Sequence, residues 1–255
     1  MPVNKKYLAV FGFDKIFHIY NRTNNKEPLF LSAENYHYFL RQFDFYISPF
    51  AETFAWNLLP NHFHFLIRIK SLSLIKAWIK EILAEKQTKT ELQFLSDNAI
   101  NVLIEMAFKR LFTSYAMAFN TMYKRKGNLF SRTFKRVNIL KDSQFTQTLI
   151  YIHANAQKHK IFDNFLHHKW SSYHSIVSTK PTKILRDEVL YWFGGLEQFK
   201  KVHRQMSDHF TISLVPLKTM RIDIRNKIKF TPFEKGVNFI LYLAQNLSVL
   251  NLNKT

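Results

Sequence analysis

The sequence lacks cysteine, long apolar runs and enough acidic residues to balance its basic ones, and each shortage excludes a class of protein. Without cysteine the chain has neither a disulfide framework nor a thiolate metal site, so imidazole, carboxylate and amide groups are left as metal ligands. The longest apolar run, from Phe239 to Ala244, is too short to cross a bilayer, and the N-terminus shows no signal-peptide pattern. We therefore expect a cytoplasmic protein with no membrane segment.

The shortage of acidic residues leaves a strongly basic chain. Lys and Arg number 37 against 18 Asp and Glu, which gives a formal net charge of +19 over 255 residues. This charge predicts an anionic partner, and nucleic acid is the first candidate, although an AT-rich coding sequence would also enrich Lys, Asn, Phe and Ile. The hydrophobic share of 47% and the aromatic share of 16% are enough for a folded core and exclude a disordered chain.

The first part of the chain has the pattern of a strand, a helix and two further strands. Residues 15–21 are β-prone, and residues 32–47 have a capping serine and a helical apolar face. Residues 53–59 and 63–69 alternate as strands on either side of a tight turn.

The middle of the chain continues with helices and one more strand. Residues 72–123 are predicted to be mostly helical, residues 136–140 to form a short strand, and residues 142–157 to form a helix. Strands separated by helices, with one hairpin among them, predict an α+β domain built on a mostly antiparallel sheet.

We expect the chain to divide into a catalytic domain at residues 1–178 and a mainly helical C-terminal extension at residues 179–255. In the extension, a helix at 186–193 is predicted to stop at a Gly-Gly pair, and a second helix is predicted to end near Val202. A final apolar helix is expected close to the C-terminus.

The strand at residues 62–69 holds two histidines separated by one residue. Alternate side chains of a strand share a face, so His62 and His64 stand about 6.5–7 Å apart on the same face. That spacing lets both imidazoles reach one divalent ion, and the cationic Arg68 follows on this outer face. The residues expected to point toward the core are Phe63, Phe65, Ile67 and Ile69.

The helix at residues 142–157 carries the second part of this site. Tyr151 and Asn155 are four residues apart, so they lie one turn apart on the same helical face. If the helix crosses the sheet, Asn155 could supply a neutral oxygen ligand and Tyr151 could stand beside the ion as a nucleophile. Two imidazoles and an amide oxygen suit Mg²⁺ or Mn²⁺ and are not selective for zinc.

Structural explanations compete with each part of this site when it is taken alone. The two histidines could be solvated side chains of an exposed strand, and Tyr151 could be a half-buried aromatic residue at a helix–sheet contact. Tyr115 is a rival nucleophile on an earlier helix, where we favour a role in packing or substrate contact.

Several motifs together resemble the single-tyrosine (Y1) transposases of the IS200/IS605 type, and the REP-associated tyrosine transposases most closely. The histidine–hydrophobic–histidine motif follows Leu59-Pro60-Asn61. The other motifs are His18-Ile19-Tyr20-Asn21-Arg22, Arg125-Lys126-Gly127-Asn128-Leu129-Phe130, Tyr151-Ile152-His153-Ala154-Asn155 and Trp170-Ser171-Ser172-Tyr173-His174. The resemblance covers most of residues 8–205. Asn155 is followed by Ala156 where related sequences have proline, so the helix can continue past it.

This resemblance implies a ferredoxin-like catalytic domain in a bacterial cytoplasmic enzyme that acts on single-stranded DNA near hairpins. It implies metal ligation by His62, His64 and Asn155, with Mg²⁺ or Mn²⁺ as cofactor, and a 5′-phosphotyrosine intermediate on Tyr151. A homodimer is compatible with the sequence. Two alternatives stay open: a non-catalytic protein that binds hairpin nucleic acid, and a metal-dependent phosphodiesterase that uses water.

Basic residues around the loop at Gly127 are candidates for contacts with DNA phosphates, because Lys and Arg neutralise phosphate charge. Aromatic neighbours such as Phe130 and Trp170 could stack on unpaired bases, although core packing is the commoner role of such residues. With Arg68, the predicted DNA-binding residues are Lys124, Arg125, Lys126, Arg132, Lys135 and Arg136.

Overall fold

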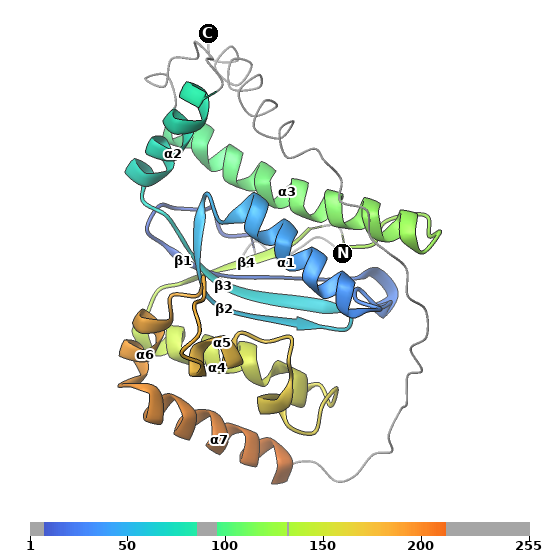
Figure 1. Ribbon diagram of the computed structural model, residues 1–255, viewed down its shortest axis with the longest axis vertical. Coiled ribbons are helices and arrows are strands. Elements are labelled where there is room, and N and C mark those ends of the chain that lie inside the picture. The colour runs from blue at the N-terminus through green and yellow to red at the C-terminus, as the bar shows by residue number, and fades with distance from the viewer. Residues whose placement is uncertain (1–7, 86–95, 132, 213–255) are drawn as a thin grey trace.

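The computed structural model describes residues 8–85, 96–131 and 133–212, and it has three layers. A β-sheet lies between two layers of helices, with α1, α2 and α3 on one side and α4 to α7 on the other (Figure 1). None of the helices in these ranges is long and apolar enough to span a bilayer.

The sheet has four strands in the order β2-β3-β1-β4, and every neighbouring pair is antiparallel. The strands are β1 (Ile16–Arg22), β2 (Ala51–Leu59), β3 (His62–Ile69) and β4 (Lys135–Ile139). The helices around them are α1 (Ala33–Ile47), α2 (Leu72–Glu85), α3 (Asp97–Met122) and α4 (Asp142–Lys158), with a short helical turn η2 (Asn24–Lys26) after β1. A β-α-β-β-α-β succession with this strand order is the ferredoxin-like arrangement. The predicted α+β fold class is confirmed.

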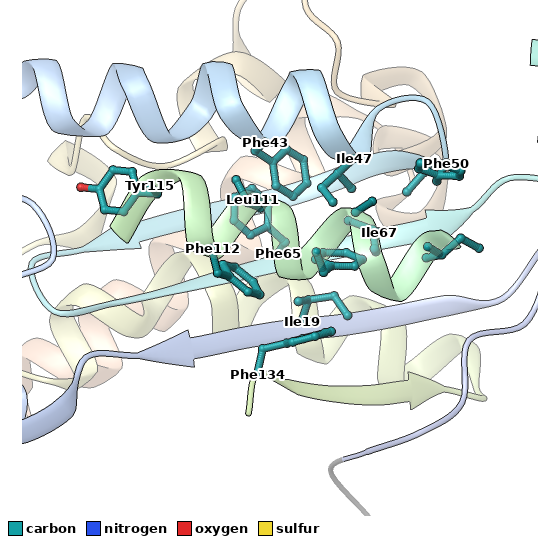
Figure 2. Packing of buried hydrophobic residues seen from close by; sticks show 14 of the residues in the cluster. Ile19, Phe43, Ile47, Phe50, Phe65, Ile67, Leu111, Phe112, Tyr115 and Phe134 are labelled. Atoms are coloured by element: carbon teal, nitrogen blue, oxygen red, sulfur yellow. The ribbon is translucent and has the colours of Figure 1, made fainter. Parts of the chain in front are cut away.

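Helices α1 and α3 cover one face of the sheet with an aromatic core. Phe63, Phe65, Ile67 and Ile69 are all buried on this face, as their alternation along β3 predicts. Figure 2 shows Phe65 and Ile67 packed against Phe43 of α1 and Leu111 of α3. The rings of Phe43 and Phe65 stack with their centroids 3.9 Å apart. Burial of each such side chain contributes about 1.5–3 kcal/mol to folding.

The opposite face of the sheet, which carries the predicted site, is covered by α4. Leu66 of β3 is fully buried there against Phe145, Leu149 and Ile152 of α4. Because α4 packs on β2 and β3, the half of this face formed by β1 and β4 is less covered. The helix that carries Tyr151 and Asn155 therefore lies across the sheet, as expected from the sequence, and the histidines are not on an exposed strand.

The C-terminal helices pack outside α4. A short turn η4 (Phe165–His167) and helix α5 (Tyr173–Val177) precede α6 (Arg186–Phe193), which ends at Gly194 with a φ of 76°. The next helix, α7 (Leu196–Ile212), is longer than the predicted helix ending near Val202. It continues because His203 and Ser207 form buried hydrogen bonds to α4, which the local sequence pattern does not reveal. The predicted final helix lies outside the described residues.

Candidate functional site

Cross-strand pairing brings the two predicted metal ligands beside three side chains of β1. Arg22 lies opposite His62, and Tyr20 lies opposite His64. Directly opposed residues share a face of the sheet, and His18, two residues before Tyr20, points to the same side. Three imidazoles, a phenol and a guanidinium therefore gather on one face.

His62 contacts the predicted third ligand directly. Its Nε2 atom lies 3.2 Å from Asn155 Oδ1, and its Nδ1 atom lies 2.6 Å from Asn61 Oδ1. Both amide oxygens accept and a neutral imidazole carries one N–H, so His62 donates to only one of them. With the proton on Nδ1, at the shorter contact, the lone pair of Nε2 faces Asn155. Asn155 is fully buried, and its Nδ2 atom has no hydrogen-bond partner among the described residues.

The arrangement of His62 and Asn155 fits two ligands of one cation. Two acceptor atoms that each lie about 2.1 Å from an ion, at right angles, are roughly 3.0 Å apart, which is close to the observed 3.2 Å. An Asn155 amide turned by 180° would instead donate Nδ2–H to His62. With the amide as placed, two acceptor atoms face each other, and a cation bound between them would make this orientation favourable without the rotation.

His64 is held by His18, a histidine outside the predicted ligand set. The His64 Nδ1 atom lies 2.9 Å from His18 Nε2, and His64 is only 4% exposed. The ring of Tyr20 stacks on both imidazoles, at 4.8 Å from His18 and 5.5 Å from His64. In the sequence, His18 and Tyr20 alternate on one face of the predicted strand at residues 15–21. This alternation does not show which strand lies alongside, so it does not predict the contact between His18 and His64.

The histidines of the site are neutral near pH 7. Burial lowers the pKa of His18 and of His62 to about 4. Burial, together with the neighbouring His18 and His62, lowers the pKa of His64 well below its ordinary value. Neutral imidazoles keep a lone pair, so the pair His62 and His64 has the protonation state of metal ligands.

The predicted nucleophile lies beside these histidines. The half-buried ring of Tyr151 meets His64 edge-on with centroids 5.7 Å apart, and it lies 6.0 Å from the ring of His18. Lys158, which was not among the predicted site residues, places its Nζ atom 4.7 Å from the Tyr151 ring centroid. Helical periodicity could have identified Lys158 in the sequence. Asn155 and Lys158 follow Tyr151 by four and seven residues, so all three lie on one helical face.

Helix α4 is fixed on both sides, and this sets the position of Tyr151 and Asn155. On the sheet side, Asn57 Nδ2 donates to the carbonyl oxygens of Ile152 at 2.6 Å and of His153 at 3.3 Å. On the side of α7, Gln157 Nε2 donates to the carbonyl of Ser207 at 3.0 Å, and Ser207 Oγ donates to Gln157 Oε1 at 3.1 Å. These buried bonds anchor the helix that carries the nucleophile.

Three of the arginines predicted to bind DNA are engaged by carboxylates. The pairs are Arg68 with Glu52 and Glu188, Arg125 with Glu27, and Arg136 with Glu105. Arg68 also lies toward the other end of β3 from His62. The carboxylates offset part of the positive charge of these arginines, and their contacts with DNA stay a prediction.

The predicted lysines are placed differently from those arginines. Lys124 and Lys126 are exposed in the loop that follows α3. Lys135 lies on β4 opposite Tyr20, with its Nζ atom 5.6 Å from the centroid of that ring. Arg132 lies outside the described residues.

Tyr115 belongs to the core and not to the site. It is 1% exposed, and its hydroxyl donates to the carbonyl of Leu29 at 2.6 Å. Burial raises the pKa of its phenol well above the ordinary value. Figure 2 shows Tyr115 among the packed residues between α1 and the sheet. A rival nucleophile at Tyr115 is therefore disfavoured, in agreement with the packing role expected from the sequence.

No metal site made only of charged or imidazole ligands is found in the part of the chain that the structure describes. Within residues 8–85, 96–131 and 133–212, no three His, Cys, Asp or Glu side chains are grouped to hold an ion. The predicted site is of another kind, because its third ligand is the amide oxygen of Asn155.

Comparison with known proteins shows a similarity of fold. No family model matches the sequence, and no curated protein matches it. The fold is similar to a solved structure described as a REP-associated tyrosine transposase bound to a REP hairpin, with a TM-score of 0.48 and 14% identity. The match covers 71% of this chain and 89% of that chain. The function of this chain is therefore inferred from the geometry of its own residues.

Proposed function

We propose that the protein is a metal-dependent strand transferase of the transposase type, which cleaves and rejoins single-stranded DNA near hairpins through a phosphotyrosine. One observation carries this proposal: Tyr151 and Asn155 lie on one face of α4, with Tyr151 beside His64 and Asn155 against His62. One helical turn thus separates a buried amide that can bind the metal ion from a tyrosine that can attack the phosphate.

The residues that would hold the cofactor are His62, His64 and Asn155, and their neutral donor set fits Mg²⁺ or Mn²⁺. When bound there, a divalent ion would neutralise charge on the phosphodiester and stabilise the transition state. The protein itself orients the ligands: Asn61 sets the tautomer of His62, and His18 holds the ring of His64.

Tyr151 supplies the nucleophile in this proposal. Its oxygen forms a bond to phosphorus as the bond from phosphorus to the 3′ oxygen breaks, and the phenol proton ends on the departing 3′-OH. The bond energy is kept in the 5′-phosphotyrosine, so rejoining needs no external energy source. Lys158 places its Nζ atom 4.7 Å from the centroid of the Tyr151 ring, so a cation lies beside the proposed nucleophile.

The net charge of +19 supports DNA as the partner. Because several arginines are paired with carboxylates, the charge available to DNA comes from the remaining basic residues. Arg22 and Lys158 flank the histidine cluster, and Lys124 and Lys126 extend the basic surface along the next loop.

The test is a Tyr151→Phe variant incubated with labelled single-stranded hairpin DNA and Mg²⁺ or Mn²⁺. The parent should form an adduct that survives denaturation, and Tyr151→Phe should bind the same DNA nearly as tightly but form none. Tyr115→Phe is the matched control: it loses a buried hydrogen bond and about 1 kcal/mol of stability but keeps the adduct.

Other outcomes would select the alternatives. A parent that binds hairpins but neither cleaves nor forms an adduct would be a binding protein. Cleavage that persists in Tyr151→Phe would indicate a phosphodiesterase that uses water. Loss of the adduct in Tyr115→Phe alone would contradict the assignment of Tyr151.

A further inference from the structure

A hollow of about 250 Å³ lies at the end of β1. Its lining residues are Arg22, Thr23, Asn24, Asn25, Lys26 and Ser131. One of these lining residues, Arg22, is the cross-strand partner of His62, a proposed metal ligand. Cα atoms of such antiparallel partners are about 4.5–5.5 Å apart.

The loop that forms this hollow is braced by hydrogen bonds from several directions. Asn24 Nδ2 donates to the carbonyls of Asn128 and Phe130, both at 3.1 Å. The backbone N–H of Thr23 donates to the carbonyl of Asn61 at 3.0 Å. The backbone N–H of Ser131 donates to the carbonyl of Arg22 at 2.9 Å. The hollow is thus a preformed feature of the fold.

Two consecutive residues of the loop have left-handed backbone conformations. Asn25 has a φ of 52° and Lys26 a φ of 60°, in a region that lysine rarely adopts. Such backbone is held in place only when the surroundings impose it, and it is found often at ligand sites. Here it turns the chain so that Lys26 and Arg22 line the same hollow.

The charge of the hollow is not neutralised within the described residues. Arg22 and Lys26 are both exposed, and neither forms an ion pair with a carboxylate of the described chain. The nearest acidic residue in sequence, Glu27, is held by Arg125, whose Nε atom donates to it at 2.8 Å. A rigid hollow with two such cations and no lining carboxylate is suited to an anion, and a guanidinium matches a phosphate bidentately.

We propose that this hollow binds a backbone phosphate of the single strand, adjacent to the phosphate attacked by Tyr151. The proposal rests on the proposed function and names the contact that sets the register of the strand. Arg22 and Tyr20 share the less covered half of the sheet face, which offers the strand a path from the histidine cluster to the hollow. Phosphate contacts of this kind position a nucleic acid without reading its sequence.

The experiment is a double-mutant cycle between Arg22 and single phosphates of the DNA. Binding is measured with the full chain in a Tyr151→Phe background, which blocks cleavage, and each backbone phosphate in turn is replaced by a neutral methylphosphonate. At one position next to the bond that the parent cleaves, the replacement should weaken binding about 10-fold in Tyr151→Phe. In the Tyr151→Phe/Arg22→Ala protein the same replacement should cost less than about 2-fold, because the partner is already gone.

The controls separate this contact from general electrostatics. Arg204→Ala, which changes an exposed arginine on α7, should leave the coupling unchanged. Arg22→Ala with Lys26→Ala should also flatten the plot of log binding constant against log salt concentration. Its slope should fall by about 0.7 for each phosphate that the protein no longer neutralises. An equal loss in both backgrounds at every position, or no position at which the replacement weakens binding in Tyr151→Phe, would overturn the phosphate assignment.

The two proposals fail separately in this design. Adduct formation by the parent reports on strand transfer, and coupling in the cycle reports on the hollow. A parent that forms the adduct without any coupling refutes only the hollow. A parent that forms no adduct, with coupling at one phosphate of the bound strand, refutes strand transfer and supports phosphate binding in the hollow.

Discussion

His153 of α4 and His203 of α7 are joined by a buried hydrogen bond, with Nδ1 of His153 2.9 Å from Nε2 of His203. Both side chains are fully buried. His153 also lies 2.8 Å from Ser172 Oγ through its Nε2 atom, and His203 Nδ1 lies 2.8 Å from the carbonyl of Phe199. The helix that carries Tyr151 is therefore tied to the outermost helix by a chain of imidazoles.

The direction of every bond in this chain follows from its two ends. The Phe199 carbonyl can only accept, so Nδ1 of His203 donates and its Nε2 accepts from His153. Nε2 of His153 must then accept from the Ser172 hydroxyl, whose oxygen accepts from the backbone N–H of Trp56 at 2.9 Å. Burial lowers the pKa of His203 to about 4 and that of His153 well below its ordinary value, so both rings are neutral, as this pattern requires.

Replacing His203 should show how much this chain stabilises the fold. His203→Leu leaves the Nδ1–H of His153 unpaired in the core and should cost about 2–3 kcal/mol of unfolding free energy. His203→Gln places an amide oxygen near the position of Nε2 and should cost clearly less. Urea denaturation of both variants measures this, and equal losses would contradict the proposed bond direction.

Stability should fall as the pH drops below about 6.5. A histidine whose pKa is about 4 in the folded protein, such as His203 or His168, takes up a proton more readily when unfolded, at its ordinary value of 6.5. The unfolded state therefore gains protons first, and stability is lost between pH 6.5 and 4 as the pH falls. Urea midpoints at several pH values should decrease over this window. His203→Gln removes one of these groups, so its decrease should be shallower, and a parallel decrease would contradict the assignment.

Replacing Arg125 should lower the stability of the protein, whereas replacing the neighbouring Lys124 and Lys126 should affect DNA binding. Arg125→Ala removes the ion pair with Glu27 and the bonds to the carbonyls of Gly127 and Asn128. Because the pair is partly exposed, the expected loss of stability is only about 1 kcal/mol, measured by thermal unfolding.

The comparison variant is Lys124→Ala with Lys126→Ala, which changes two exposed cations. It should leave the melting temperature unchanged and lower the salt dependence of DNA binding. A change in the salt dependence with Arg125→Ala alone would restore that arginine as a DNA contact.

His62 is the cleanest probe of the proposed metal site. Removing its ring in His62→Ala should abolish Mn²⁺ binding measured by calorimetry, and EDTA should stop cleavage by the parent. His159→Ala is the matched control, because its ring lies 5.4 Å from that of His62 but is not a proposed ligand. Mn²⁺ binding that survives in His62→Ala would refute the ligand set.

His64 is a poorer probe of the metal than the sequence suggests. An outer sheet face would tolerate His64→Ala, but the side chain is 4% exposed and bonded to His18. Its removal leaves a cavity and an unpaired imidazole, so a loss of activity in this variant also reflects lower stability.

The sequence by itself determined the features that repeat within one element. Alternation along β3 predicted which residues face the aromatic core and which carry the imidazoles. The four-residue spacing of Tyr151 and Asn155 predicted that they share a helical face. These predictions hold because the periods of strands and helices are set by the local backbone geometry.

Only the tertiary structure decided which polar groups have partners. The sequence does not distinguish Arg125 from Arg22, since each is a basic residue in a polar segment. In the structure, Arg125 pairs with Glu27, which is 98 residues away, whereas Arg22 pairs with no carboxylate of the described chain. The approach of His18 to His64 and the extension of α7 along α4 likewise depend on contacts between distant segments. The partners and the burial of polar side chains depend on which helices and strands pack together, and neither the net charge nor the periodicity of the sequence predicts that packing.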